Sequence, residues 1–261
     1  MKINLSIALL LFSLLVMSQT KRDIFLRDSI IKPINYKQVT NKKIYDKTYD
    51  LLKKTDTEFG YEKDIHLKIL EFSYFHNDLD NFKKDLLVLV KDYGFKIDYL
   101  TTNENYYNDL INGKLSNWFK TMYLKNHLIW VENNFDKLND IRALNEINIK
   151  DQTLAKLSSV MLDINLNQSD SIKIYSVIHR LNAENLQLIY KISEKNNCFI
   201  LSKKFPVIQN NLNSAIIHNF QMNLDDSWNL LFPYIKTAYK NNEIDNVIFQ
   251  NYDFYIQKST L

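Results

Sequence analysis

The sequence predicts an all-α protein, in which a repeat-like helical hairpin module is followed by a compact helical domain. Its 261 residues include three glycines and three prolines, too few for an all-β fold, which needs a turn about every 8–12 residues. Apolar side chains recur at spacings of three and four, which places them on one face of a helix. Short polar segments separate these runs, so helices joined by polar turns are the expected architecture.

Residues 1–18 have the parts of a cleavable secretory signal peptide. Lys2 provides the positive n-region, residues 5–17 form an apolar run, and small residues precede a cut before Gln19. The run is shorter than the about 20 apolar residues that cross a bilayer, and no later stretch reaches that length. We therefore expect an exported protein, periplasmic or secreted, without an integral membrane segment after cleavage.

Charge and cysteine content limit the partners of this chain. The 33 basic and 30 acidic residues give a formal charge of +3 and alternate along the sequence, so the basic patch of a nucleic-acid-binding protein is missing. Cys198 is the only cysteine, which excludes a disulfide within the chain. Its apolar neighbours at 199–201 favour burial, with a reactive thiol or an intermolecular bridge as the alternatives.

Residues 41–140 are expected to form the first module. The preceding lead-in, residues 19–40, contains Pro33 and has no sustained apolar period. A first helix follows from Asn41 to about Gly60, because Ile44, Leu51 and Leu52 recur at helical spacing.

The next two helices form a hairpin over residues 61–75 and 79–93. Their apolar faces comprise Ile65, Ile69 and Phe72 in the first helix, and Phe82, Leu86, Leu89, Val90 and Tyr93 in the second. A polar turn, 76–78, separates them, and Gly94 is placed to end the second helix as its C′ residue. One hairpin cannot bury its own apolar face, so it must pack against neighbouring helices.

The segment from Phe72 to Asp98, FSYFHNDLDNFKKDLLVLVKDYGFKID, resembles a degenerate tetratricopeptide hairpin. The resemblance implies a repeat-like module that binds a protein or peptide ahead of a second domain. Aromatic residues crowd the following stretch, 101–140: Tyr106, Tyr107, Trp118, Phe119, Tyr123 and Trp130. Aromatic side chains bury the largest areas, so we expect them to lie in a core in preference to lining a ligand surface. The boundary between domains is expected near Asp140.

Residues 141–261 carry the strongest helical signal. A first stripe consists of Leu154, Leu157, Met161 and Ile164. After a polar turn over 165–170, a second stripe consists of Ile174, Val177, Ile178, Leu181, Leu188, Ile189 and Ile192, and it includes Asn185. The pattern breaks at 196–206 and resumes at 211–220, and a last amphipathic segment covers 244–257.

The C-terminal half, residues about 140–257, resembles an uncharacterised bacterial family that is defined only as a domain of unknown function. The matching elements are Asp151-Gln152 at the start of a helix, Asn185, Phe205-Pro206, the segment 215–218 that ends in His218, and the closing segments 238–244 and 252–253. The resemblance implies no activity, because the family has none assigned.

Five polar residues of this half are the candidates for a site. His218 follows an apolar run and could be a general base, a metal ligand or a buried ring. Asp151 could cap its helix or supply a carboxylate, and Asp253 is an alternative carboxylate. Asn185 lies on an apolar stripe, so it needs hydrogen-bond partners. Gln152 or His218 could provide them in a polar network.

Two functional hypotheses follow. The first is an exported helical module that interacts with a protein or peptide through its helix faces. The second is a hydrolase of an envelope or extracellular substrate, with His218 as the base and Asp151 or Asp253 as its orienting carboxylate. No metal or cofactor is expected, because the five histidines show no ligand spacing and no glycine-rich phosphate loop occurs.

Overall fold

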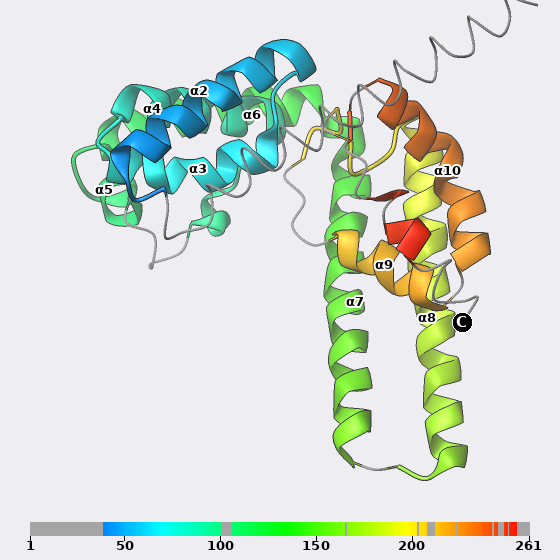
Figure 1. Ribbon diagram of the computed structural model, residues 1–261. Helices are drawn as coiled ribbons and strands as arrows, with labels where there is room; N and C mark the ends of the chain where they lie inside the picture. The colour runs from blue at the N-terminus through cyan, green and yellow to red at the C-terminus, as the bar shows by residue number, and fades with distance from the viewer. Residues whose placement is uncertain are drawn as a thin grey trace, which may run out of the picture. The chain divides into compact units, whose positions relative to one another are not determined.

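The computed structural model describes residues 39–100, 106–164, 166–202, 204–207, 212–222, 224–241, 243–244, 248–249 and 251–254. The elements are α2 (Lys42–Phe59), α3 (Lys63–Phe75), α4 (Leu79–Tyr93), η1 (Ile97–Tyr99), α5 (Tyr107–Ile111), α6 (Ser116–Asn133), η2 (Phe135–Lys137), α7 (Leu138–Ile164), α8 (Gln168–Lys195), α9 (Leu212–Met222) and α10 (Leu224–Lys240). No strand occurs in these ranges, which confirms the predicted all-α class (Figure 1).

Three predictions concern the ends of the chain. The signal peptide, residues 1–18, and positions 19–38 of the lead-in lie outside the described residues. Of the last predicted helix, positions 248–249 and 251–254 are described and are helical. Among the helices that the structure describes, none combines the length and the apolar character of a membrane span.

The chain divides into two compact units, Met1–His127 (unit 1) and Leu128–Leu261 (unit 2). The division lies within α6 and therefore upstream of the boundary that the sequence indicated near Asp140. Trp130 explains the difference, because its side chain is buried in the core of unit 2. Its indole Nε1 donates a hydrogen bond to the carbonyl oxygen of Pro206, at 2.7 Å.

Unit 1 contains the predicted hairpin, formed by α3 and α4. Asn77 in the intervening turn has φ 56°, and Gly94 ends α4 in the left-handed conformation with φ 63° and ψ 38°, as its C′ placement predicted. Helix α2 packs on the hairpin through a buried cluster of Val39, Tyr45, Tyr49, Leu52, Ile69 and Phe72. Helix α3 therefore buries Ile69 and Phe72 against α2.

Gly60 separates α2 from α3 in a conformation that only glycine adopts readily, with φ 84° and ψ 170°. We expect Gly60→Ala to lower the free energy of unfolding of unit 1 by about 1–3 kcal/mol. Gly94→Asn is the matched control and should cost under about 1 kcal/mol, since asparagine tolerates the left-handed region. Urea unfolding of both variants measures the difference, and equal losses would contradict this strain at Gly60.

Unit 2 is built on the long antiparallel pair α7 and α8 (Figure 1). Helix α9 crosses both of them, and α10 packs on α8 and α9. The core between these helices includes Ile147, Ile189, Ala215, Ile216, Leu231 and Ile235. Cys198 packs against this core but is half-buried, so the burial favoured from its apolar neighbours is only partial.

The predicted stripe of Leu154, Leu157, Met161 and Ile164 is wrong as a single core face. Met161 is buried, whereas Leu157 is 45% exposed and Ile164 is 60% exposed. At about 100° per residue, Leu157 and Ile164 lie about 60° around the helix from Leu154 and Met161. Helix α7 therefore has a second apolar face, which the described residues of unit 2 leave exposed.

Candidate functional site

His218 and Asp151 form a close pair between α9 and α7. The imidazole Nδ1 lies 2.7 Å from Asp151 Oδ1. The Asp151 side chain is fully buried, while that of His218 is 27% exposed. A buried carboxylate thus holds Nδ1 of a histidine whose side chain is partly exposed, an arrangement that suits proton transfer.

The predicted capping role of Asp151 is wrong. Helix α7 begins at Leu138, so Asp151 lies in its interior, where the backbone amides already have helical partners. The reason is the unbroken apolar spacing of Ile141, Leu144 and Ile147, which continues through Asp151 on the same buried face. Its carboxylate is therefore directed at α9 instead of at a helix end.

The surroundings of His218 favour its protonated form. The hydrogen bond with Asp151 raises the pKa of His218, burial of the ring lowers it in part, and the charge of Asp151 adds a further increase. The net pKa lies above the usual value of 6.5. Because Nδ1 is bound to Asp151, a proton exchanged with a ligand would pass through Nε2.

The other candidate residues differ in their positions. Gln152 Nε2 donates to Asp151 Oδ2 at 3.2 Å, so it extends the pair. Asn185 is buried, as its stripe predicted, but its Nδ2 has no hydrogen-bond partner among the described residues. The Asn185 amide nitrogen therefore does not make the predicted hydrogen bond to Gln152 or His218. Asp253 is exposed, and the carboxylate that orients His218 is Asp151.

Asn182 of α8 is a second buried amide in unit 2, which the sequence analysis did not identify. Asn182 is 3% exposed; its Nδ2 donates to Met222 Sδ at 3.3 Å, and its Oδ1 has no partner in the described part of the chain. Met222 is one helical turn beyond His218, on the same side of α9. A buried amide group left without any partner costs about 1–3 kcal/mol.

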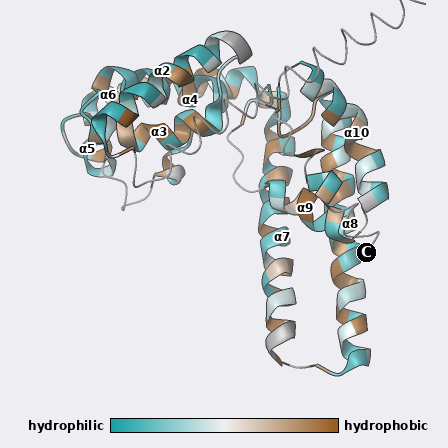
Figure 2. Ribbon diagram, viewed as in Figure 1, coloured by the Kyte–Doolittle hydropathy of each residue, from teal (hydrophilic) through white to brown (hydrophobic). Residues whose placement is uncertain are grey.

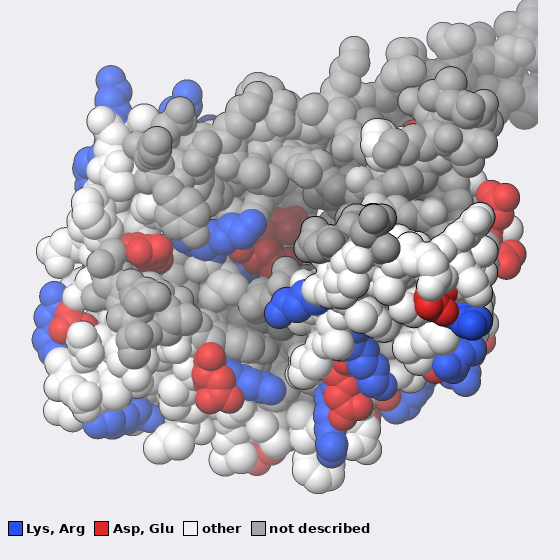
Figure 3. Space-filling view, turned by 90° about the horizontal axis from the view of Figure 1, so that it is seen from below, with Lys and Arg blue, Asp and Glu red and all other residues white. Residues whose placement is uncertain are grey.

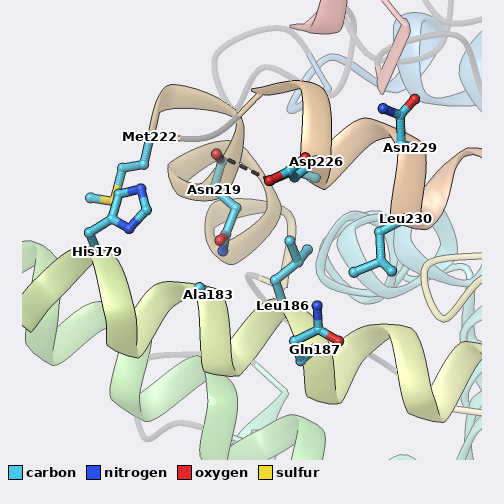
Figure 4. Close-up of a pocket in the computed structure, with 10 residues that line it drawn as sticks. His179, Ala183, Leu186, Gln187, Asn219, Met222, Asp226, Asn229 and Leu230 are labelled. Atoms are coloured by element: carbon cyan, nitrogen blue, oxygen red, sulfur yellow. Dashed lines mark hydrogen bonds between the residues drawn. The ribbon is translucent and has the colours of Figure 1, made fainter.

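A pocket of about 530 Å³ opens between α8, α9 and α10 (Figure 4). Its polar lining consists of His179, Gln187, Asn219, Asp226, Ser227 and Asn229, and its apolar lining consists of Ala183, Leu186, Met222 and Leu230. The lining has one carboxylate and no lysine or arginine among the described residues. His218 is not part of it, because that ring faces α7 while its neighbour Asn219 faces the pocket.

A second histidine centre lies in unit 1, and the sequence analysis missed it. His66 of α3 is held between Asp56 of α2, at 2.9 Å from Nε2, and Asp85 of α4, at 3.1 Å from Nδ1. Tyr49 donates to Asp85 at 2.8 Å, and the Tyr61 ring stacks on the imidazole at 3.9 Å. One signal was available, since His66 precedes the buried Ile69 by three residues and so shares its face.

In the described ranges, no group of three or more His, Cys, Asp or Glu residues is arranged to hold an ion. The geometry defines an all-α protein of two units, with one histidine–carboxylate centre in each. Comparison with protein-family models, curated proteins and solved structures gave no match.

Proposed function

We propose that the protein is an interaction module whose contact surface is the uncovered face of the α7–α8 hairpin, and that it binds a helix carrying a matching apolar face. The observation that supports this proposal is a row of exposed aliphatic side chains on α7, which we name the α7 stripe. Its members and their exposed fractions are Ile149 (67%), Leu157 (45%), Val160 (47%) and Ile164 (60%).

The α7 stripe is continuous. At about 100° and 1.5 Å per residue, its four side chains lie within a sector of about 80° and extend over about 22 Å of the helix. Thr153 falls inside the same sector, and its hydroxyl already donates to the carbonyl of Ile149 at 2.8 Å. The stripe therefore presents no unsatisfied polar group that a partner would have to pair.

Helix α8 adds apolar surface to the same hairpin. Ile172 is 61% exposed and Tyr175 is 45% exposed, and brown segments recur along the distal turns of both helices (Figure 2). Contiguous exposed apolar surface of this kind marks interaction sites in proteins. A straight row with helical spacing fits another helix, whose side-chain ridges can pack into its grooves.

The test is photo-crosslinking from the stripe. A benzoylphenylalanine at Val160, in the chain that begins at Gln19, should crosslink to an apolar helix face, with the contact identified by mass spectrometry. The same group at Ser159, which is exposed but lies about 100° away around α7, should give at least tenfold less product. Equal products from both positions, or none from Val160, would contradict the proposal.

A second candidate function is acid–base hydrolysis of an envelope or extracellular substrate, which the 2.7 Å contact between His218 and Asp151 supports. A panel of ester, amide and glycoside substrates tests it. Activity that is lost in His218→Gln and retained in His76→Gln, a change at a histidine of unit 1 whose ring contacts the carbonyl oxygen of Val39, would support this candidate. Activity that survives in His218→Gln would exclude this pair as its source.

A further inference from the structure

We infer that the pocket between α8, α9 and α10 binds an organic cation, namely an ammonium group carried on an aliphatic stem. The inference is independent of the proposed function, because no residue of the α7 stripe lines this pocket. Its volume of about 530 Å³ falls within the range of small-molecule sites, about 300–1,000 Å³. The hydrogen-bonding groups, the charge and the apolar surface of the lining each favour this class of ligand.

The floor of the pocket consists of its three buried lining residues, Leu186, Asn219 and Ser227, which are at most 5% exposed. Asn219 Nδ2 donates to the carbonyl oxygen of Ala215 at 2.8 Å, and Ser227 Oγ donates to the carbonyl oxygen of Asn219 at 3.4 Å. The Asn219 amide nitrogen is thus turned toward its own helix. The groups left to meet a ligand are the Asn219 amide oxygen and the lone pairs of the Ser227 hydroxyl, and both are acceptors.

The wall of the pocket has a further unpaired acceptor behind it. Asn182 is buried, and its Nδ2 donates at 3.3 Å to the sulfur of Met222, which lines the pocket. Its Oδ1 has no partner among the residues that the structure describes. Floor and wall therefore share an excess of acceptors over donors, and a ligand that brings N–H donors is their chemical complement.

The rim determines the sign of the charge. Asp226 is the one carboxylate of the described lining, which has no lysine or arginine. Arg180 and Lys191 line a neighbouring groove on α8, where Arg180 pairs with Glu184 at 2.7 Å. On the face in Figure 3, basic and acidic groups are interspersed, so that face carries no field of one sign that would attract ions by itself. An anion at the pocket would meet Asp226 without a counter-charge, whereas an ammonium group would pair with it.

The apolar lining fits the stem of such a ligand. Leu186 of α8 and Leu230 of α10 point into the space between these helices (Figure 4), and Ala183 and Met222 extend the aliphatic surface. The described lining contains no Phe, Tyr or Trp, so a flat ring system finds no aromatic partner for stacking. A methylene chain, in contrast, packs well against aliphatic side chains. Alkyl diamines and the lysine side chain share this chemistry.

NMR titration with 1,5-diaminopentane tests the inference on the chain that begins at Gln19, in about 150 mM salt to screen distant charges. The diamine should shift the side-chain amide signals of Asn219 and Gln187. 1,5-Pentanediol has the same stem without charge and should bind at least about tenfold more weakly. Equal affinity for the two compounds, or no shift with the diamine up to about 10 mM, would overturn the inference.

Two neighbouring carboxylates provide the matched variants. Asp226→Asn keeps the size of the side chain and should raise the dissociation constant of the diamine at least about fivefold. Asp225→Asn, at an exposed position outside the lining, should leave it within about twofold. Circular dichroism should show an intact fold in both variants, and equal effects of the two substitutions would overturn the inference.

A blocked lysine, Nα-acetyl-lysine N-methylamide, distinguishes the two sources of the cation. Affinity at least equal to that of the diamine would indicate a lysine side chain of a peptide, and affinity about tenfold lower would indicate a free amine. Either result supports the cation site, provided that Asp226→Asn weakens the binding of the compound that binds more tightly.

Discussion

Replacing His66 with glutamine is expected to lower the free energy of unfolding of unit 1 by about 3–5 kcal/mol, the usual cost of removing one partner from a buried ion pair. The His66 side chain is 3% exposed and that of Asp85 is 2% exposed. Glutamine is neutral, so Asp85 would remain buried beside Asp56 without the positive charge that lies between them. The loss should be confined to α2, α3 and α4, because His66 joins these three helices.

The same centre predicts how the stability of unit 1 depends on pH. Burial lowers the pKa of His66, but the hydrogen bonds and charges of Asp56 and Asp85 raise it further, to about 9. A histidine whose folded pKa exceeds its unfolded value of 6.5 stabilises the fold fully below pH 6.5 and loses that contribution as the pH rises through 9. At about 1.4 kcal/mol per pKa unit, the stability of unit 1 should fall by about 3 kcal/mol across this interval.

Hydrogen-exchange protection factors in α2–α4, measured at pH 6, 7.5 and 9, test the loss in His66→Gln and the pH dependence together. Protection factors are corrected for the pH dependence of intrinsic exchange, so values at different pH can be compared. The wild-type chain should lose protection as pH rises, and His66→Gln should show low protection without that slope. His179→Gln, at an exposed position of unit 2, is the control and should leave the profile of unit 1 unchanged. A wild-type profile that is flat between pH 6 and 9 would refute the charged state assigned to His66.

His66 also shows where sequence reasoning stops. Helical spacing and Gly94 predicted the α3–α4 hairpin, because these signals are local and act within one or two turns. The partners of His66 come from other helices, 10 and 19 residues away, and their contact depends on how three helices pack. No spacing rule relates such positions. The sequence could therefore place His66 on a buried face, but it could not show what balances its charge there.

Unit 2 illustrates the same limit for the candidate site and for its surface. His218 and Asp151 were both predicted as candidates. A polar residue within an apolar run was enough to single them out. The role of Asp151 depended on where α7 begins, and the helix starts at Leu138, more than three turns before the expected place. The exposure of Leu157 and Ile164 was missed because helical spacing identifies apolar faces without showing which of them a neighbour covers.

The second large effect on stability is expected at the His218–Asp151 pair. Here we predict which of two substitutions lowers the free energy of unfolding more, as well as by how much. His218→Leu should cost about 2–3 kcal/mol, because it leaves the fully buried carboxylate of Asp151 with one amide donor, from Gln152. Asp151→Leu should cost less, since the partner left behind is an imidazole that is 27% exposed and can be neutral and hydrated. Urea unfolding of unit 2 at pH 6 measures both losses, and the reverse order would refute the assignment of the buried charge to Asp151.

Combining the two substitutions separates stability from chemistry. With both partners replaced by leucine, no buried charge is left alone, so the double variant should unfold within about 1 kcal/mol of the wild-type chain. The coupling energy would then be negative and about as large as the two single losses together. A pair whose joint removal costs so little is not needed to hold α7 against α9. The effect of the buried carboxylate of Asp151 would then lie in the His218 ring itself, whose Nδ1 it holds at 2.7 Å and whose pKa it raises.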